Sequence, residues 1–151
     1  MTRILTIIAL FVSTFSFVNV AQGKPTNSGS PEEFIQFYFD AFNDEDKKRL
    51  EMVFLKPFSS VSGDKVTVYK SWREYINYEV VKKTGWSYSS LDNSKVVFGN
   101  DTTAAVSVDF ARWRDDQSKI LSTRVLFVVT KQNGDWRIAS VVIPSDVPIN
   151  Q

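Results

Sequence analysis

The chain has 151 residues, of which 43% are hydrophobic and 14% aromatic, and this is enough to build one domain with its own core. Its formal net charge of +1 provides no basic field to hold a phosphate backbone, so nucleic acid is not an expected partner. The absence of Cys and His excludes disulfides, thiolate nucleophiles, imidazole bases and zinc sites built on either side chain. We therefore expect no metal site, and no motif indicates a cofactor.

Residues 1–23 have the pattern of a secretory signal peptide. Arg3 precedes an apolar stretch that continues to Val20, and small side chains at Ala21 and Gly23 fit a cleavage site. The sequence therefore predicts an exported protein, either periplasmic or secreted. Since the chain lacks Cys, a domain in that compartment must depend on its core for stability.

The apolar stretch also permits an alternative, an uncleaved membrane anchor over residues 4–21. Its length is near the lower limit for a membrane span, and several Ser, Thr and Asn side chains dilute it. Contact with a membrane is expected only in that case. Further along, residues 24–30 are predicted to form a flexible leader, residues 31–147 the folded domain and residues 148–151 a C-terminal tail.

The first predicted helix begins at Ser30. Ser30, the following proline and Glu33 make a capping box, in which the serine and glutamate side chains bond each other's backbone N–H groups. Apolar and aromatic side chains then recur at three-four spacing as far as Phe42. The break at Asn43 ends this helix.

Two further helices are predicted. The second covers residues 45–55 and is ended by Pro57, which cannot continue a helix. For the third, Ser71 and Glu74 repeat the spacing of a capping box, and Gly85 ends the helix. The rest of the domain is predicted as strands, at residues 65–70, 87–98, 102–114, 119–131 and 135–143.

Turn positions predict how the last strands pair. A two-residue loop at Asn133 and Gly134 pairs Phe127 with Ser140, and a similar loop after Asp115 pairs Asp109 with Arg124. Because side chains alternate across a strand, one face of the sheet is aromatic-rich and is expected to receive the helices. This inner face is predicted to carry Val106, Val108, Phe110, Arg112, Val125, Phe127, Val129, Trp136 and Ile138.

The opposite, outer face is also apolar, with no helix left to cover it. We predict that it forms a homodimer interface, since exposed apolar patches of this kind mark contacts between proteins. The residues expected to form that interface are Ala111, Leu126, Val128, Val141 and Ile143.

In this order, helices followed by a sheet that ends in a hairpin resemble the NTF2-like superfamily, close to SnoaL-like and ketosteroid-isomerase-like proteins. Two segments carry the resemblance, "IQFYFDAFNDEDKKRLEMVF" and "NGDWRIASVVI". The resemblance implies the cystatin-like α+β cone: three N-terminal helices packed on a curved antiparallel β-sheet of four to six strands. It also implies a conical pocket between them. Since this fold hosts both enzymes and binding domains, function has to be argued from residues.

Tyr38 falls where ketosteroid isomerases keep a tyrosine that donates a hydrogen bond to the developing enolate oxygen. The general-base aspartate of those enzymes falls near Ser59 and their second acid near Leu126, so neither carboxylate is present. The histidine of the dehydratase branch is absent as well. No catalytic set is therefore identified, and a hydrogen-bonded core role for Tyr38 is the alternative.

We expect an open but modest ligand pocket in the cone. Arg112 could anchor a carboxylate there, or its side chain could reach past the helices to water. The residues expected to line the pocket are Tyr38, Phe42, Trp72, Phe110, Arg112 and Phe127.

The sequence thus favours an exported domain that binds a small ligand, apolar or carboxylate-bearing, or that interacts with another protein. Two alternatives stay open. One is a cofactor-independent isomerase or lyase that uses Tyr38 with a carboxylate such as Asp40. The other is an assembly module of the cell envelope, for which a shallow or filled cone would be expected.

Overall fold

Residues 27–144 are described by a computed structural model, and they begin with a helix at the predicted place. Helix α1 (Pro31–Asn43) starts with the capping box: Ser30 Oγ accepts from Glu33 N at 3.2 Å and Glu33 Oε2 accepts from Ser30 N at 2.9 Å. Most of its apolar side chains are buried, including Tyr38 and Phe42. The three-four spacing of the sequence therefore produces a helix with one face in the core.

Helix α2 (Lys47–Val53) is shorter than predicted, because the chain turns into a strand, β1 (Phe54–Ser62). Pro57 lies within this strand, although proline cannot donate a hydrogen bond to a ladder. In the structure β1 lies between two other strands, and the pairing with one of them is irregular between Phe54 and Ser59, on either side of the proline. This irregularity accommodates Pro57, and the sequence analysis missed the strand.

The third predicted helix forms as two pieces, α3 (Trp72–Tyr75) and α4 (Tyr78–Lys83). Ser71 makes no side-chain cap, and Asn77 instead starts α4 by accepting a bond from Val80 N at 3.3 Å. An asparagine side chain that bonds the backbone in this way competes with a continuous helix. The predicted capping box at Ser71 was therefore wrong.

The sheet has six strands in the order β2-β1-β6-β5-β4-β3. The five predicted strands lie within a residue or so of their predicted ranges, and β1 is the sixth. Strand β1 runs parallel to β6 while every other pair is antiparallel, so the predicted antiparallel sheet is in fact mixed. The remaining strands are β2 (Lys65–Tyr69), β3 (Tyr88–Gly99), β4 (Thr103–Trp113), β5 (Lys119–Gln132) and β6 (Asp135–Ile143).

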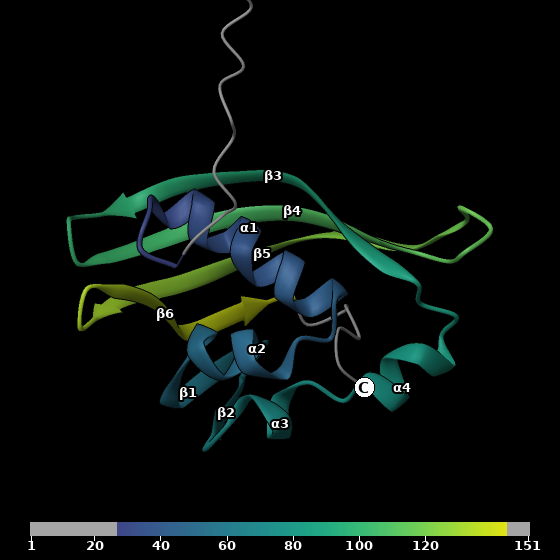
Figure 1. Cartoon of the computed structure of the whole chain (residues 1–151), viewed down its shortest axis with the longest axis horizontal. Helices are drawn as coiled ribbons and strands as arrows, with labels where there is room; N and C mark the ends of the chain where they lie inside the picture. The colour runs from purple at the N-terminus through teal and green to yellow at the C-terminus, as the bar shows by residue number, and fades with distance from the viewer. Residues whose placement is uncertain (1–26, 145–151) are drawn as a thin grey trace, which may run out of the picture.

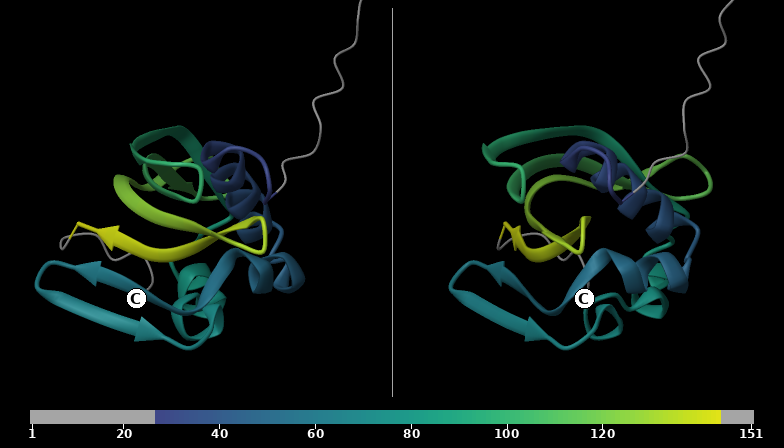
Figure 2. Two further views of the ribbon diagram at one scale, coloured as in Figure 1. Left: turned by 90° about the vertical axis from the view of Figure 1, so that its left-hand side faces the viewer. Right: turned by 60° about the vertical axis from the view of Figure 1, so that its left-hand side comes forward.

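The helices cover one face of this sheet, and its other face carries no helix (Figure 1). Helix α1 runs across β3, β4 and β5, whereas α2, α3 and α4 close the end of the molecule near β1 and β2. Figure 2 shows that the sheet curves around α1. This is the α+β cone that the sequence predicts, with its apolar core between α1 and the sheet.

The register between β4 and β5 follows the prediction. Asp109 pairs with Arg124, and the guanidinium donates to both carboxylate oxygens at 2.6 and 2.9 Å. Phe110 pairs with Thr123, which places the phenylalanine on the helix-covered face with 5% exposure.

Between β5 and β6 the prediction holds only near the turn. Val129 pairs with Ile138 as expected, but a bulge then shifts the register, so that Phe127 pairs with Val141 and not with Ser140. Since a shift of one residue moves a side chain to the other face, Val141 turns into the core, where it is 1% exposed. Ile143, at 8% exposure, is likewise buried.

The predicted dimer surface changes accordingly. Val141 and Ile143 belong to the core, and Ala111 is fully buried at 0% exposure. Leu126 and Val128 remain partly exposed on the outer face. The bulge adds Val142, 37% exposed, to that face beside Leu126.

The part of the expected leader that the structure describes contacts β6. Trp136 donates its backbone N–H to Asn27 O at 2.7 Å and its ring Nε1–H to Gly29 O at 2.9 Å. Residues 1–26 and 145–151 lie outside the described residues, and with them the predicted signal peptide and C-terminal tail. Within residues 27–144, no helix is both long and apolar enough to cross a membrane.

Candidate functional site

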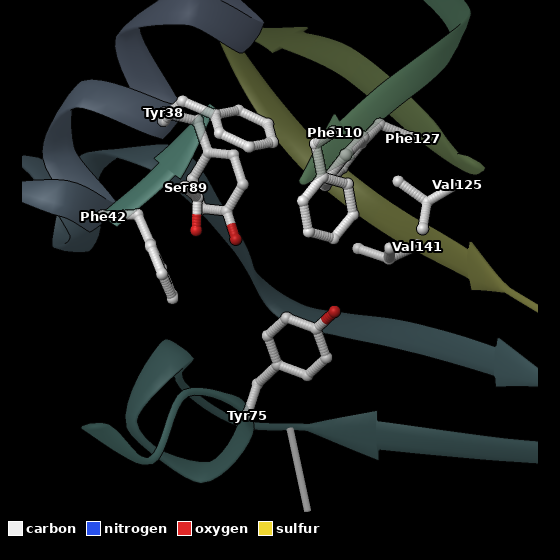
Figure 3. Close-up of a pocket in the computed structure, with 9 residues that line it drawn as sticks. Tyr38, Phe42, Tyr75, Ser89, Phe110, Val125, Phe127 and Val141 are labelled. Carbon is white, nitrogen blue, oxygen red and sulfur yellow. The ribbon is translucent and has the colours of Figure 1, made fainter. Parts of the chain in front are cut away.

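A small cavity lies in the cone between α1 and the inner face of the sheet. The space open to the centre of a water molecule is about 20 Å³, which accommodates one water. The cone therefore holds only a small cavity in this conformation, and the open ligand pocket stays a prediction. The residues lining the cavity are Tyr38, Phe39, Phe42, Tyr75, Ser89, Phe110, Val125, Phe127 and Val141 (Figure 3).

Aromatic rings from α1 and the sheet form most of the wall. Tyr38 meets Phe127 with 5.5 Å between ring centroids, and Phe39 meets Phe110 at 5.6 Å, both edge to face. As the sequence predicts, helical spacing turns the α1 residue of each pair toward the sheet. Strand alternation turns Phe110 and Phe127 toward α1. Four of the six predicted pocket residues therefore line one cavity: Tyr38, Phe42, Phe110 and Phe127.

Hydroxyl groups form the polar part of the wall. They belong to Tyr38 on α1, Ser89 on β3 and Tyr75 on α3 (Figure 3). Ser89 Oγ accepts from Trp86 Nε1 at 3.0 Å. The backbone of Ser89 is fixed by Asn43, which bonds both its N–H and its carbonyl, at 2.8 and 2.9 Å.

The sequence analysis missed Ser89 and Tyr75. Ser89 pairs with Arg112 across β3 and β4, so a predicted register for β3 would have found it on the inner face. Tyr75 follows the break in the third predicted helix, and its direction depends on that break. Only the tertiary structure therefore identifies Tyr75.

The phenol of Tyr38 is the most informative group of the site. Its residue is 8% exposed and lines the cavity, and within residues 27–144 its hydroxyl has no hydrogen-bond partner. Burial raises the pKa of Tyr38 well above its ordinary value, so the hydroxyl stays protonated and can donate.

Arg112 lies beside the cavity rather than in its wall. It is 5% exposed, so the alternative in which its head group reaches water was wrong. The guanidinium carbon lies 5.6 Å from the centroid of the Phe42 ring, and the charge faces the phenols of Tyr38, Tyr75 and Tyr78. Burial lowers the pKa of Arg112, as expected for a cation removed from water.

Two other predicted residues lie elsewhere. Trp72 is buried outside the cavity, where its Nε1 donates to Glu51 Oε2 at 2.8 Å. Asp40 accepts from Gln36 Nε2 at 2.8 Å and does not line the cavity. The cavity wall contains no carboxylate, so the described residues bring no acid together with Tyr38. They also contain no cluster of acidic side chains that could hold a metal ion.

Comparison with solved structures shows the same fold. A protein of unknown function with a cystatin-like fold from Nostoc punctiforme is 18% identical, with a TM-score of 0.59 over 79% of this chain and 90% of its own. An NTF2-like superfamily protein from Salmonella enterica is 19% identical, with a TM-score of 0.52 over 79% and 92%. An NTF2-like protein from Novosphingobium aromaticivorans is 12% identical, with a TM-score of 0.58 over 74% and 77%.

No curated protein matched the chain in the corresponding sequence search. Residues 30–146 match a family described as NTF2-like protein (DUF6841), which covers helix α1, the sheet and every residue of the cavity wall. The chain belongs to this NTF2-like family.

Proposed function

We propose that the protein is an exported binding module that takes a small ligand with an apolar body and one carboxylate in the cone. The observation that carries this proposal is the hydroxyl of Tyr38. This hydroxyl lines the cavity and keeps its proton, so it can donate a hydrogen bond to a molecule held there. A ligand oxygen, or a water in its absence, would accept its hydrogen bond.

The surroundings of Tyr38 suggest the chemistry of the ligand. Phe110, Phe127 and Val125 offer an apolar wall for a ring or a short hydrocarbon body. Arg112 lies on the polar side, and its guanidinium has five N–H donors, so it can serve more than one acceptor. A planar carboxylate matches that donor geometry and also accepts from a phenol.

A panel of monocyclic carboxylates, each paired with its neutral amide, tests this proposal by NMR titration. We expect the carboxylates to shift resonances of the cavity residues and to bind more tightly than the amides. Substituting Arg112→Gln should weaken carboxylate binding by roughly tenfold or more, because a hydrogen bond to a charged group is lost, and should leave amide binding unchanged. Equal binding of acids and amides to the native protein would contradict the role of Arg112.

The outer face of the sheet supports a second candidate function, interaction with another protein. Cross-strand pairs place Val66, Val61, Val142 and Leu126 in one row, and Val68, Ser59, Ser140, Val128, Ala105 and Phe98 in the next. The side chains at the ends of the second row are exposed to solvent, Val68 by 65% and Phe98 by 77%. An apolar surface that crosses the whole sheet is typical of an interface, and we propose a homodimer through it.

A further inference from the structure

A second space lies close to the cavity, on the surface of the molecule. It is a hollow of about 580 Å³ between the turn before α2 and the α3–α4 region. The residues lining it are Glu45, Lys47, Trp72, Arg73, Ile76, Asn77, Tyr78, Glu79 and Lys82. Its volume is within the range of ligand sites in proteins, whereas the cavity accommodates one water.

One short segment borders both spaces. Tyr75 lines the cavity, whereas Ile76, Asn77 and Tyr78 line the surface hollow. Tyr75 and Tyr78 both lie near enough to Arg112 to interact with its charge, although Arg112 itself lines neither space in this conformation. We propose that residues 75–78 form a door, whose opening joins the cavity to the hollow and admits the ligand to Arg112. This inference rests on the proposed ligand site in the cone.

The local structure is suited to such a movement. Helices α3 and α4 have 4 and 6 residues, and helices of this length are not stable by themselves. Between them the chain is not helical, and Asn77 is exposed. Segments with so little regular structure open at lower free energy than the strands of a sheet. The door therefore consists of the kind of chain that opens without unfolding the domain.

Packing and polar contacts together keep the door closed. The ring of Tyr75 packs edge to face on Phe54, Phe58 and Tyr69, with centroids 5.9, 5.5 and 5.2 Å apart. The hydroxyl of Tyr78 donates to Phe42 O at 2.8 Å, and the two rings lie 5.2 Å apart between centroids. Lys82 forms an ion pair with Glu45 at 2.5 Å across the hollow. Since Phe42 also lines the cavity, the Tyr78 hydroxyl joins the door directly to the wall of the ligand site. We call this hydrogen bond between Tyr78 and Phe42 O the latch.

The closed door also explains why the cavity is so small. Tyr75 projects toward Phe110 and Val141 from the opposite side of the cavity (Figure 3). Withdrawal of its ring would free the volume of a phenol next to the apolar wall. A ligand that enters with its apolar end first would then have its carboxylate at Arg112.

Hydrogen exchange tests the door without any ligand. Peptides covering residues 72–83 should exchange faster than α1 in the native protein. Substituting Tyr78→Phe removes the latch bond and should speed their exchange by roughly two- to tenfold, with no change in β5. Tyr88→Phe is the matched control, because Tyr88 is exposed on β3, and should have no effect. Protection of residues 72–83 equal to that of α1 would overturn the door.

A cross-link then connects the door to binding. The chain has no Cys, so Glu45→Cys with Lys82→Cys can be joined uniquely by a short bismaleimide. We expect the linked protein to lose benzoate binding, measured by NMR titration, while the unlinked double variant keeps it. A link between Asp109→Cys and Arg124→Cys, on the outer face, is the control and should leave binding intact.

The outcomes separate the two proposals. Benzoate binding that survives the Glu45–Lys82 link would overturn the door and leave the ligand site in place. Fast exchange of residues 72–83 together with no benzoate binding to any variant would leave the door in place and contradict the proposed ligand.

Discussion

Tyr38 places a phenol in the interior of the cone, and its contribution to stability should depend on pH. Burial raises its pKa above the ordinary 10.0, so the folded state keeps the proton at pH values where the unfolded chain loses it. The contribution of the protonated phenol to the free energy of unfolding is therefore complete below pH 10.0. It is lost as pH rises from there toward the raised pKa of the folded state.

We expect Tyr38→Phe to change the free energy of unfolding by less than about 0.5 kcal/mol at neutral pH, because the hydroxyl makes no hydrogen bond to the described residues. Above pH 10.0, the native protein should lose stability faster than the variant. Urea titrations across this pH range measure both effects. A loss of about 1 kcal/mol at neutral pH would instead indicate a satisfied core hydroxyl.

Phe110 tests how completely the cone is filled. It is 5% exposed and packs against Phe39, so Phe110→Ala should leave a void and destabilise the protein by about 3–5 kcal/mol. Denaturant unfolding with an unchanged m-value is the measurement. A loss near 1 kcal/mol would mean that the void already exists in solution, as expected for a door that stands open.

At the scale of elements, the bulge in β6 determines which residues enter the core. Val141 and Val142 are neighbours of identical chemistry, but the first is 1% exposed and the second 37%. Val141→Ala should destabilise the protein by about 2 kcal/mol, because it removes buried methyl groups. Val142→Ala should remain within about 0.5 kcal/mol of the native protein as a monomer. Thermal or urea unfolding measures both losses. A larger loss for Val142→Ala than for Val141→Ala would contradict the bulge and favour the regular hairpin register.

At the scale of the whole molecule, the outer face predicts a homodimer. Leu126 lies in its central strands beside Val142, so Leu126→Lys should place a charge in the interface and yield a folded monomer. Light scattering with circular dichroism measures both properties. Arg137→Ala, on β6 outside the two apolar rows, is a control that should remain dimeric. The dimer is ruled out if the native protein is already monomeric at micromolar concentrations typical of stable complexes.

Export is the other property of the whole chain. If the signal peptide is cleaved, mass spectrometry of periplasmic or secreted protein should show a new N-terminus near Lys24. Recovery of intact Met1 in the membrane fraction would favour the anchor over residues 4–21 instead.

Local patterns in the sequence determined the elements whose signals are local. The capping box at Ser30 fixes the start of α1, and the Asn133-Gly134 turn fixes the hairpin of β5 and β6, because each involves only neighbouring residues. Alternation then places Phe110 and Phe127 on the inner face. Together with the resemblance to the NTF2-like superfamily, these features predict the α+β cone and four of the nine residues of the cavity wall.

Long-range pairing decided the rest. Strand β1 pairs in parallel with β6, a long-range contact that no local pattern around Pro57 indicates. The bulge that turns Val141 inward depends on how β6 fits between β1 and β5. The positions of Tyr75 and Ser89 at the cavity follow from the break between α3 and α4 and from the pairing of β3 with β4. Such contacts join residues far apart in the chain, so only the tertiary structure could show that the cone is nearly closed.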